Sequence, residues 1–93
     1  MMILVMTDRA SQRYFKEFIG LIKSFADEKT LTQFLRAILT PKEQEEIPRR
    51  LQIVKMLNQG LPQRIIAKRL AVGVATVTRG SKEVQKGNFK KVF

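Results

Sequence analysis

The side chains of this chain that are suited to chemistry are mostly arginine, lysine and threonine, and the sequence contains no histidine and no cysteine. Zinc sites built on these two residue types and nucleophiles paired with histidine are therefore excluded. Glu43, Glu45 and Glu46 cluster at the start of a predicted helix, where carboxylates interact favourably with the helix dipole. No glycine-rich phosphate loop accompanies them, so the sequence predicts neither an enzyme nor a metal or cofactor site.

The positive charge of the chain is concentrated in its last third. The formal net charge is +10, and residues 61–93 carry eight basic residues and one acidic residue. This distribution favours a polyanionic partner, with nucleic acid such as double-stranded DNA first and an anionic membrane second. The basic segment holds small residues where a membrane-binding helix carries large apolar ones, so we expect no membrane partner. A basic surface that is merely solvated is the alternative.

Two short predicted helices, at about 62–70 and 74–85, fit a helix-turn-helix that spans about residues 62–83. The small side chain of Ala67 lets these helices approach closely, and Gly73 is expected to let the chain turn into the second helix. The other residues expected in the seam between the two helices are apolar: Ile66, Leu70, Val72 and Val77.

The second of these helices begins with small and hydroxyl-bearing side chains, which suit entry into the major groove of DNA. The predicted groove-facing residues are Val74, Ala75, Thr76 and Thr78. The positive side chains around them are expected to contact phosphates: Arg64, Lys68, Arg69, Lys82 and Lys86. The alternative is an ordinary helical hairpin with a basic, solvated face.

Upstream, the spacing of apolar residues predicts two further helices before residue 40. The first is amphipathic and covers about 9–27. The second is short and opens with Thr30 and Gln33 as a capping box.

A third upstream helix is predicted to start after Thr40 as N-cap, with Pro41 in its first turn and Glu43 completing the cap, and to end at Gly60. Pro48 predicts a bend near residues 44–48. The expected buried face of this helix carries Ile47, Leu51, Val54 and Leu57.

These elements predict a single all-α domain over residues 1–93, with core and dimerisation helices at about 9–60. A core of this size is marginal, which favours a homodimer. The apolar run Met1–Met6 is too short for a signal peptide, and no later run is long enough to span a bilayer. We therefore expect a cytoplasmic protein.

One stretch of the chain resembles the tryptophan repressor family. The resemblance covers about residues 31–83 and is carried by Leu39-Thr40-Pro41, by Arg50 and above all by the run from Gly73 to Ser81. It implies an all-α, Trp-repressor-like helical array, assembled as an intertwined homodimer. It also implies a repressor that binds palindromic operator DNA when L-tryptophan is bound as corepressor.

The same resemblance implies a tryptophan site. Arg50 and Arg79 match two arginines that sandwich the indole, an arrangement that gains cation–π energy, and Arg79 can also meet the ligand carboxylate. Three upstream positions match residues of the partner subunit whose carbonyls receive the ligand ammonium. The full implied set is Ala37, Leu39, Thr40, Arg50, Arg79, Gly80 and Glu83.

The chain departs from the family pattern at several positions. Glu83 stands where the family has a serine near the polar end of the ligand, and its carboxylate either pairs with the ligand ammonium or repels the ligand carboxylate. Pro48 replaces a glycine, and the loop at residues 60–62 is one residue shorter. The sequence stops where the last helix of the family should run, so part of the usual dimer surface is expected to be missing.

Two functions therefore compete: a ligand-responsive transcriptional repressor, and a constitutive, ligand-free DNA-binding or architectural protein. Arg50 and Arg79, together with Leu39-Thr40, favour the repressor, because a ligand-free module has no need of them. For Arg50 taken alone, the alternative is a surface salt bridge with Glu46, four residues earlier.

Overall fold

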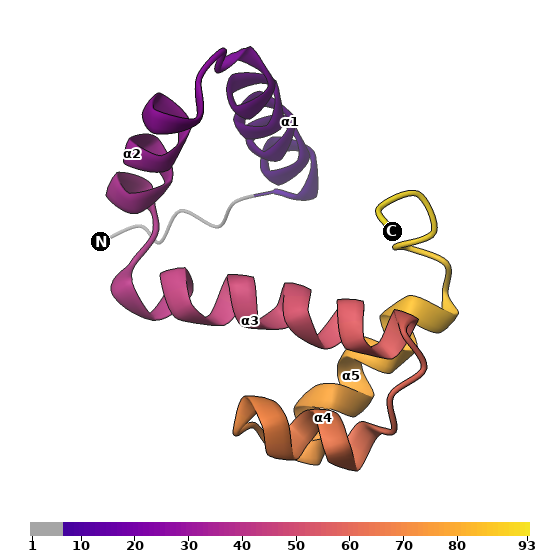
Figure 1. Ribbon diagram of the computed structural model, residues 1–93. Coiled ribbons are helices and arrows are strands. Elements are labelled where there is room, and N and C mark those ends of the chain that lie inside the picture. The colour runs from indigo at the N-terminus through magenta and orange to yellow at the C-terminus, as the bar shows by residue number, and fades with distance from the viewer. Residues whose placement is uncertain (1–6) are drawn as a thin grey trace, which may run out of the picture. The chain divides into compact units, whose positions relative to one another are not determined.

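The computed structural model describes residues 7–93, and all regular structure in this part of the chain is helical. The five helices are α1 (Asp8–Ser24), α2 (Glu28–Ile38), α3 (Pro41–Asn58), α4 (Gln63–Leu70) and α5 (Val74–Gln85) (Figure 1). The predicted all-α fold is confirmed. No described helix is long and apolar enough to cross a membrane. The predicted absence of a signal peptide at Met1–Met6 concerns residues outside the described part.

The chain divides into two compact units, one that ends at Ile38 and one from Leu39 to Phe93. The first unit contains α1 and α2. The ring of Phe34 in α2 lies beside two rings from the preceding segment, with its centroid 5.2 Å from that of Phe25 and 6.2 Å from that of Phe18. No side chain of α1 or α2 is fully buried in the single chain, and Phe15 is 66% exposed.

The start of α2 differs from the prediction, which gave Thr30 as the cap. The Asp27 carboxylate accepts hydrogen bonds from the Thr30 amide and the Thr30 hydroxyl, each at 2.9 Å. These bonds lower the pKa of Asp27, because they stabilise its charged form. Since Asp27 caps α2, the preceding helix has to end earlier, and α1 stops at Ser24 rather than at 27.

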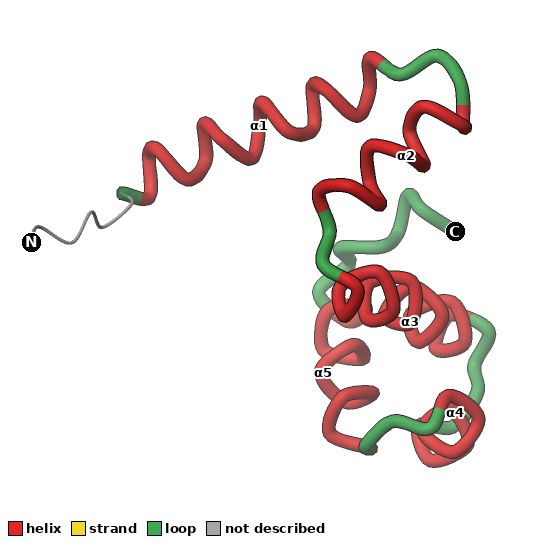
Figure 2. The backbone as a smooth tube through the Cα atoms, turned by 90° about the vertical axis from the view of Figure 1, so that its left-hand side faces the viewer, coloured by secondary structure: helices red, strands yellow, loops and turns green. Residues whose placement is uncertain are grey.

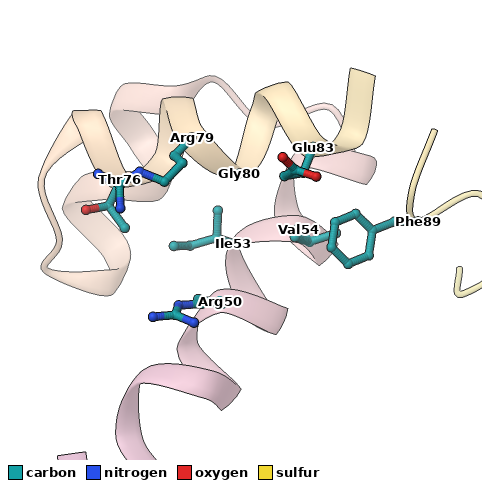
Figure 3. Close-up of a pocket in the computed structure, with 8 residues that line it drawn as sticks. All are labelled: Arg50, Ile53, Val54, Thr76, Arg79, Gly80, Glu83 and Phe89. Carbon is teal, nitrogen blue, oxygen red and sulfur yellow. The ribbon is translucent and has the colours of Figure 1, made fainter. Parts of the chain in front are cut away.

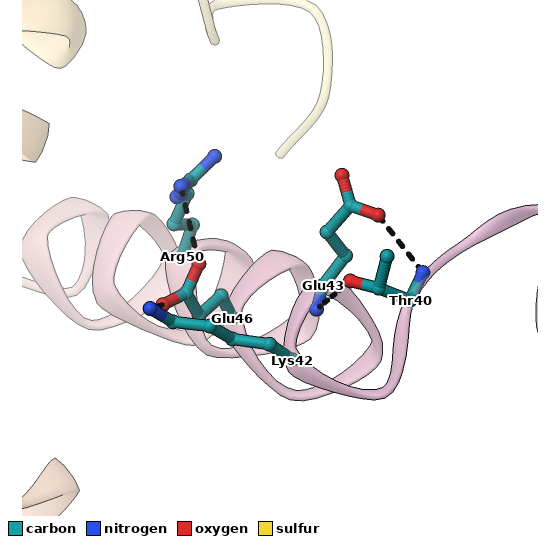
Figure 4. Close-up of polar contacts among 5 residues, drawn as sticks. All are labelled: Thr40, Lys42, Glu43, Glu46 and Arg50. Carbon is teal, nitrogen blue, oxygen red and sulfur yellow. Dashed lines mark hydrogen bonds and ion pairs between the residues drawn. The ribbon is translucent and has the colours of Figure 1, made fainter.

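The second unit begins with the capping box predicted at α3, which is confirmed (Figure 4). The Thr40 hydroxyl accepts from the Glu43 amide at 3.2 Å, and the Glu43 carboxylate accepts from the Thr40 amide at 2.8 Å. α3 then continues without a break through Pro48 to Asn58. The bend near Pro48 stays a prediction.

The core of the second unit joins three helices. Ile53 of α3, Ile66 and Ala67 of α4, and Val77 of α5 pack together, and α4 and α5 lie on the same side of α3 (Figure 2). The predicted seam between α4 and α5 is confirmed, since Leu70 and Val72 also pack against this cluster.

The predicted buried face of α3 is partly wrong. Ile47 and Leu51 are 43% and 46% exposed, whereas Ile53, which the prediction omitted, is 2% exposed. The reason is that α3 contributes only its second half to the core: Ile53, Met56 and Leu57 are its members of the cluster.

The turn between α4 and α5 places its left-handed residue at Ala71, with φ of 54°. Gly73, which was predicted to supply this freedom, is extended with φ of −70° and serves as the N-cap of α5. The reversal comes earlier because the Val72 amide donates to the Ala67 carbonyl at 3.0 Å. This bond closes the C-terminus of α4 around residue 71.

Candidate nucleic-acid interface and ligand pocket

The first turn of α5 presents slim side chains on the surface. Val74, Ala75 and Thr76 are all exposed, whereas Val77 is fully buried and holds the helix against the core. A helix start of this kind can approach the edges of base pairs in a major groove. Three of the four predicted groove-facing residues are therefore accessible; their contact with DNA stays a prediction.

Thr78, the fourth of these residues, is half-buried and is engaged within the helix-turn-helix itself. Its hydroxyl oxygen lies 2.7 Å from Gln63 Oε1 and 3.0 Å from the Val74 carbonyl oxygen, so it can donate to either. The first of these contacts links α5 to the first turn of α4. Gln63 was not predicted from the sequence, because its partner is fifteen positions away in the chain.

The basic side chains predicted at the phosphate backbone fall into two groups. Arg64, Lys68, Arg69 and Lys82 are exposed, which leaves them accessible to a polyanion. Lys86 is different, because its Nζ lies 3.1 Å from Glu83 Oε1. Part of its charge is therefore already compensated within the protein.

A cavity of about 350 Å³ lies between α3 and α5 (Figure 3). The two helices each contribute one face to it, since the lining positions are three or four residues apart. This volume is near the lower end for small-molecule sites, so the cavity suits a small ligand. It is lined by Arg50, Ile53, Val54, Thr76, Arg79, Gly80, Glu83 and Phe89.

Gly80 sets how closely α5 approaches α3. A Cβ atom added at this position would lie 3.0 Å from the Cγ2 atom of Ile53 and 3.7 Å from the Cδ1 atom of Leu57. The first distance is shorter than ordinary van der Waals contact. The floor of the cavity is therefore formed by close contact between the α5 backbone and the buried side chain of Ile53.

Arg50 and Arg79 reach the cavity from different helices, Arg50 from α3 and Arg79 from α5 (Figure 3). The alternative partner of Arg50 is present too: its Nη2 atom lies 3.8 Å from Glu46 Oε2, and Lys42 is at the same distance from the other oxygen (Figure 4). The Arg50 side chain is 70% exposed, and exposed ion pairs at such distances contribute little to stability. This pair therefore presents only a small barrier to binding a ligand at Arg50.

Glu83 is held in place by the residues that follow α5. Its Oε1 atom accepts from Lys86 Nζ at 3.1 Å, and its Oε2 atom accepts from Asn88 Nδ2 at 2.6 Å. These bonds, that of Lys86 first, lower the pKa of Glu83. The carboxylate is thus ionised at neutral pH.

Phe89 lines the same cavity, a position that the short basic and aromatic tail of the sequence does not predict. Its position depends on the turn after α5, where Gly87 has φ of 83°. Among the upstream residues of the implied set, Leu39 and Thr40 do not line this cavity, and Ala37 belongs to the first unit. Since these three were assigned to a partner subunit, their role stays a prediction.

Comparison with known proteins identifies the family. The model of the family described as Trp repressor protein matches residues 13–92. The chain is similar to proteins named Trp operon repressor homolog from several bacteria. It is 36% identical to that of Vibrio parahaemolyticus over 81 residues, which cover 86% of this chain and 79% of the relative. It is 36% identical to that of Vibrio cholerae, also over 81 residues, which cover 86% of this chain and 79% of the relative. It is 38% identical to that of Actinobacillus succinogenes over 69 residues, 73% of this chain and 68% of the relative. The chain therefore belongs to the Trp repressor family of non-enzymatic, DNA-binding transcriptional regulators.

Proposed function

We propose that this protein is a ligand-responsive repressor that binds palindromic operator DNA as a homodimer, with L-tryptophan as corepressor. The observation that supports it most strongly is the cavity between α3 and α5, which Arg50 and Arg79 enter from two helices. Guanidinium groups on two sides of a small cavity suit an aromatic ring by cation–π contact and a carboxylate by ion pairing. The cytoplasm, where bacterial operator DNA lies, is the expected location.

The switch rests on the angle between α3 and α5. In the proposed mechanism, an indole ring between Arg50 and Arg79 fixes this angle, and α5 carries the DNA-reading residues on its first turn. The ligand then favours the geometry that fits two successive major grooves. Because ligand and DNA bind the same state, each strengthens the binding of the other, typically by about 1–3 kcal/mol.

The proposed dimer is supported by the first unit, whose helices bury none of their side chains fully in the single chain. Large apolar side chains such as Phe15, Ile19 and Leu21 are exposed there. Dimeric helix-turn-helix proteins, of which Trp repressors are an example, place their recognition helices about 34 Å apart. Light scattering at micromolar concentration should therefore give the mass of two chains; a monomer, with and without DNA, would count against the dimer.

The decisive experiment measures operator binding with and without L-tryptophan. A DNA site is first selected from random duplexes in the presence of the protein and L-tryptophan, and its affinity is then measured at both conditions. Arg50→Ala should abolish the tryptophan dependence, because it removes one of the two guanidinium groups. Lys55→Ala, which removes one positive charge from an exposed position of α3 outside the cavity, is the matched control and should keep it.

Two outcomes would contradict the proposal. If Arg50→Ala responds to tryptophan as the parent protein does, the arginine sandwich is wrong. If the parent protein binds its operator equally well with and without tryptophan, the constitutive, ligand-free DNA-binding protein is the better account.

A further inference from the structure

The four residues that follow α5, Lys86 to Phe89, lie next to the ligand cavity in the sequence but have no role in the function proposed above. Phe89 forms part of the cavity wall. Lys86 and Asn88 bind the two oxygens of the Glu83 carboxylate, which lines the same cavity. Three of the four residues thus either touch the cavity or hold a group that does.

The charges around the cavity are segregated. Arg50 and Arg79 lie towards one end, and Glu83 and Phe89 lie towards the other (Figure 3). Along α5 this order follows from the sequence, since Glu83 comes one helical turn after Arg79. An α-amino acid carries one negative and one positive group beside its side chain, and this arrangement of charges is complementary to it.

The Glu83 carboxylate keeps room for a third partner. Two carboxylate oxygens offer about four acceptor positions, and Lys86 and Asn88 each use one. The amide of Asn88, 2.6 Å from Oε2, also restricts the rotation of the carboxylate and so fixes its direction. A carboxylate that is already oriented loses less entropy when it binds a ligand.

We propose that Lys86–Phe89 is part of the ligand site: Glu83, held by Lys86 and Asn88, pairs with the ammonium group of the amino-acid ligand, and Phe89 forms the apolar wall beside it. The ammonium thereby gains a charged partner in the protomer that holds the indole, in addition to the partner-subunit carbonyls expected from the family resemblance. This inference rests on the proposed function, because it assigns the selectivity of the same cavity. Of the two possibilities for Glu83, pairing with the ligand ammonium and repulsion of the ligand carboxylate, the proposal selects the first.

The test is calorimetry on the full chain with two probes, L-tryptophan and indole-3-propionate, which lacks the ammonium group. Glu83→Gln should lower the affinity for L-tryptophan about tenfold, the size expected of a half-exposed, charge-assisted hydrogen bond. It should not lower the affinity for indole-3-propionate. Asn88→Ala should act in the same direction with a smaller effect, because it only releases the carboxylate. Glu45→Gln, an exposed position of α3 outside the cavity, changes the net charge equally and should alter neither affinity.

Phe89 is tested with the same probes. Phe89→Ala should weaken both ligands by a similar factor, since the wall contacts parts that they share, and Phe89→Leu should restore most of the loss by refilling the space. Circular dichroism should show that each variant retains the helical content of the parent.

The outcomes distinguish a failure of the role proposed for Glu83 from a failure of the corepressor proposal. If the parent protein binds L-tryptophan and Glu83→Gln leaves the ratio of the two affinities unchanged, or strengthens L-tryptophan, the role of Glu83 is wrong while the corepressor proposal stands. If the parent protein binds neither probe, the corepressor proposal fails and this inference fails with it.

Discussion

Gly80 is the position at which the packing of α3 against α5 can be tested most directly. Replacing it with alanine adds one methyl group that meets the Ile53 Cγ2 atom at 3.0 Å. Ile53 is buried and β-branched, so it has little freedom to move aside inside a helix. The new methyl group therefore overpacks the core, which typically costs about 1–3 kcal/mol.

A second effect of this substitution has the opposite sign. Alanine is favoured over glycine in a helix interior by about 0.8–1.0 kcal/mol. We therefore expect Gly80→Ala to lower the free energy of unfolding by about 1 kcal/mol, within a range of about 0–2 kcal/mol. For a domain of this size, each 1 kcal/mol corresponds to a shift in Tm of about 4–8 °C.

Gly20→Ala is the matched control, because it makes the same change inside α1, where the added Cβ has nothing within 4 Å. It should stabilise by about 1 kcal/mol, so the two variants should differ by the overpacking cost of about 1–3 kcal/mol. Thermal melts are compared at one protein concentration, since assembly makes Tm depend on concentration. If Gly80→Ala is stabilised as much as Gly20→Ala, the close contact at Ile53 does not constrain the fold.

Three further variants test other parts of the structure. Lys68→Ala should weaken specific and random DNA alike and reduce the slope of log affinity against log salt by about 1; an unchanged slope would show that Lys68 touches no phosphate. Thr40→Ala should cost about 0.5–2 kcal/mol of stability in urea unfolding, because it removes half of the capping box. The hydrogen bonds from Thr40 also lower the pKa of Glu43 below its usual 4.5, so the parent protein gains stability above that pH and loses it as the pH falls through the lowered value. This loss should be smaller in Thr40→Ala; an identical acid profile would contradict the linkage. Ala71→Gly should raise Tm slightly, since glycine adopts a φ of 54° without strain, and a lower Tm would contradict this.

The elements fixed by neighbouring residues were predictable from the sequence. The bounds of α5, Val74–Gln85, agree with the predicted 74–85, and the capping box of Thr40 and Glu43 was read correctly. In both cases the groups that decide the structure lie within a few positions of each other. Arg50 and Arg79 both line the cavity, as expected, but they lie far apart in the sequence, and the family resemblance supplied their pairing.

The features that the sequence analysis missed depend on contacts between distant segments. The residue in the left-handed conformation is Ala71 rather than Gly73, because α4 must end before the chain can turn and pack α5 against it. Ile53, rather than Ile47, is buried because α4 and α5 cover only the second half of α3. Apolar spacing along α3 identifies candidate faces, but the face that is covered depends on where the other helices lie.

Phe89 illustrates the same limit at the end of the chain. Its place in the cavity wall depends on the turns after α5, and the composition of so short a segment does not predict the path that it takes. The hydrogen bond between Thr78 and Gln63 across the helix-turn-helix could not be predicted from apolar spacing either, since each is an ordinary polar residue in its own helix.

The absence of buried side chains in α1 and α2 bears on how the protein is made. These helices leave the ribosome before α3, α4 and α5, yet none of their side chains is fully buried in a single chain. The later segment, from Leu39 onwards, gathers its core from Ile53, Ile66 and Val77, which all lie within that one compact unit. Forming this core requires no contact with the earlier helices. We therefore expect the segment from Leu39 onwards to fold before α1 and α2, which in the proposed dimer would complete their packing only when two chains meet. During that interval the nascent aromatic surface is the segment that chaperones and proteases would encounter.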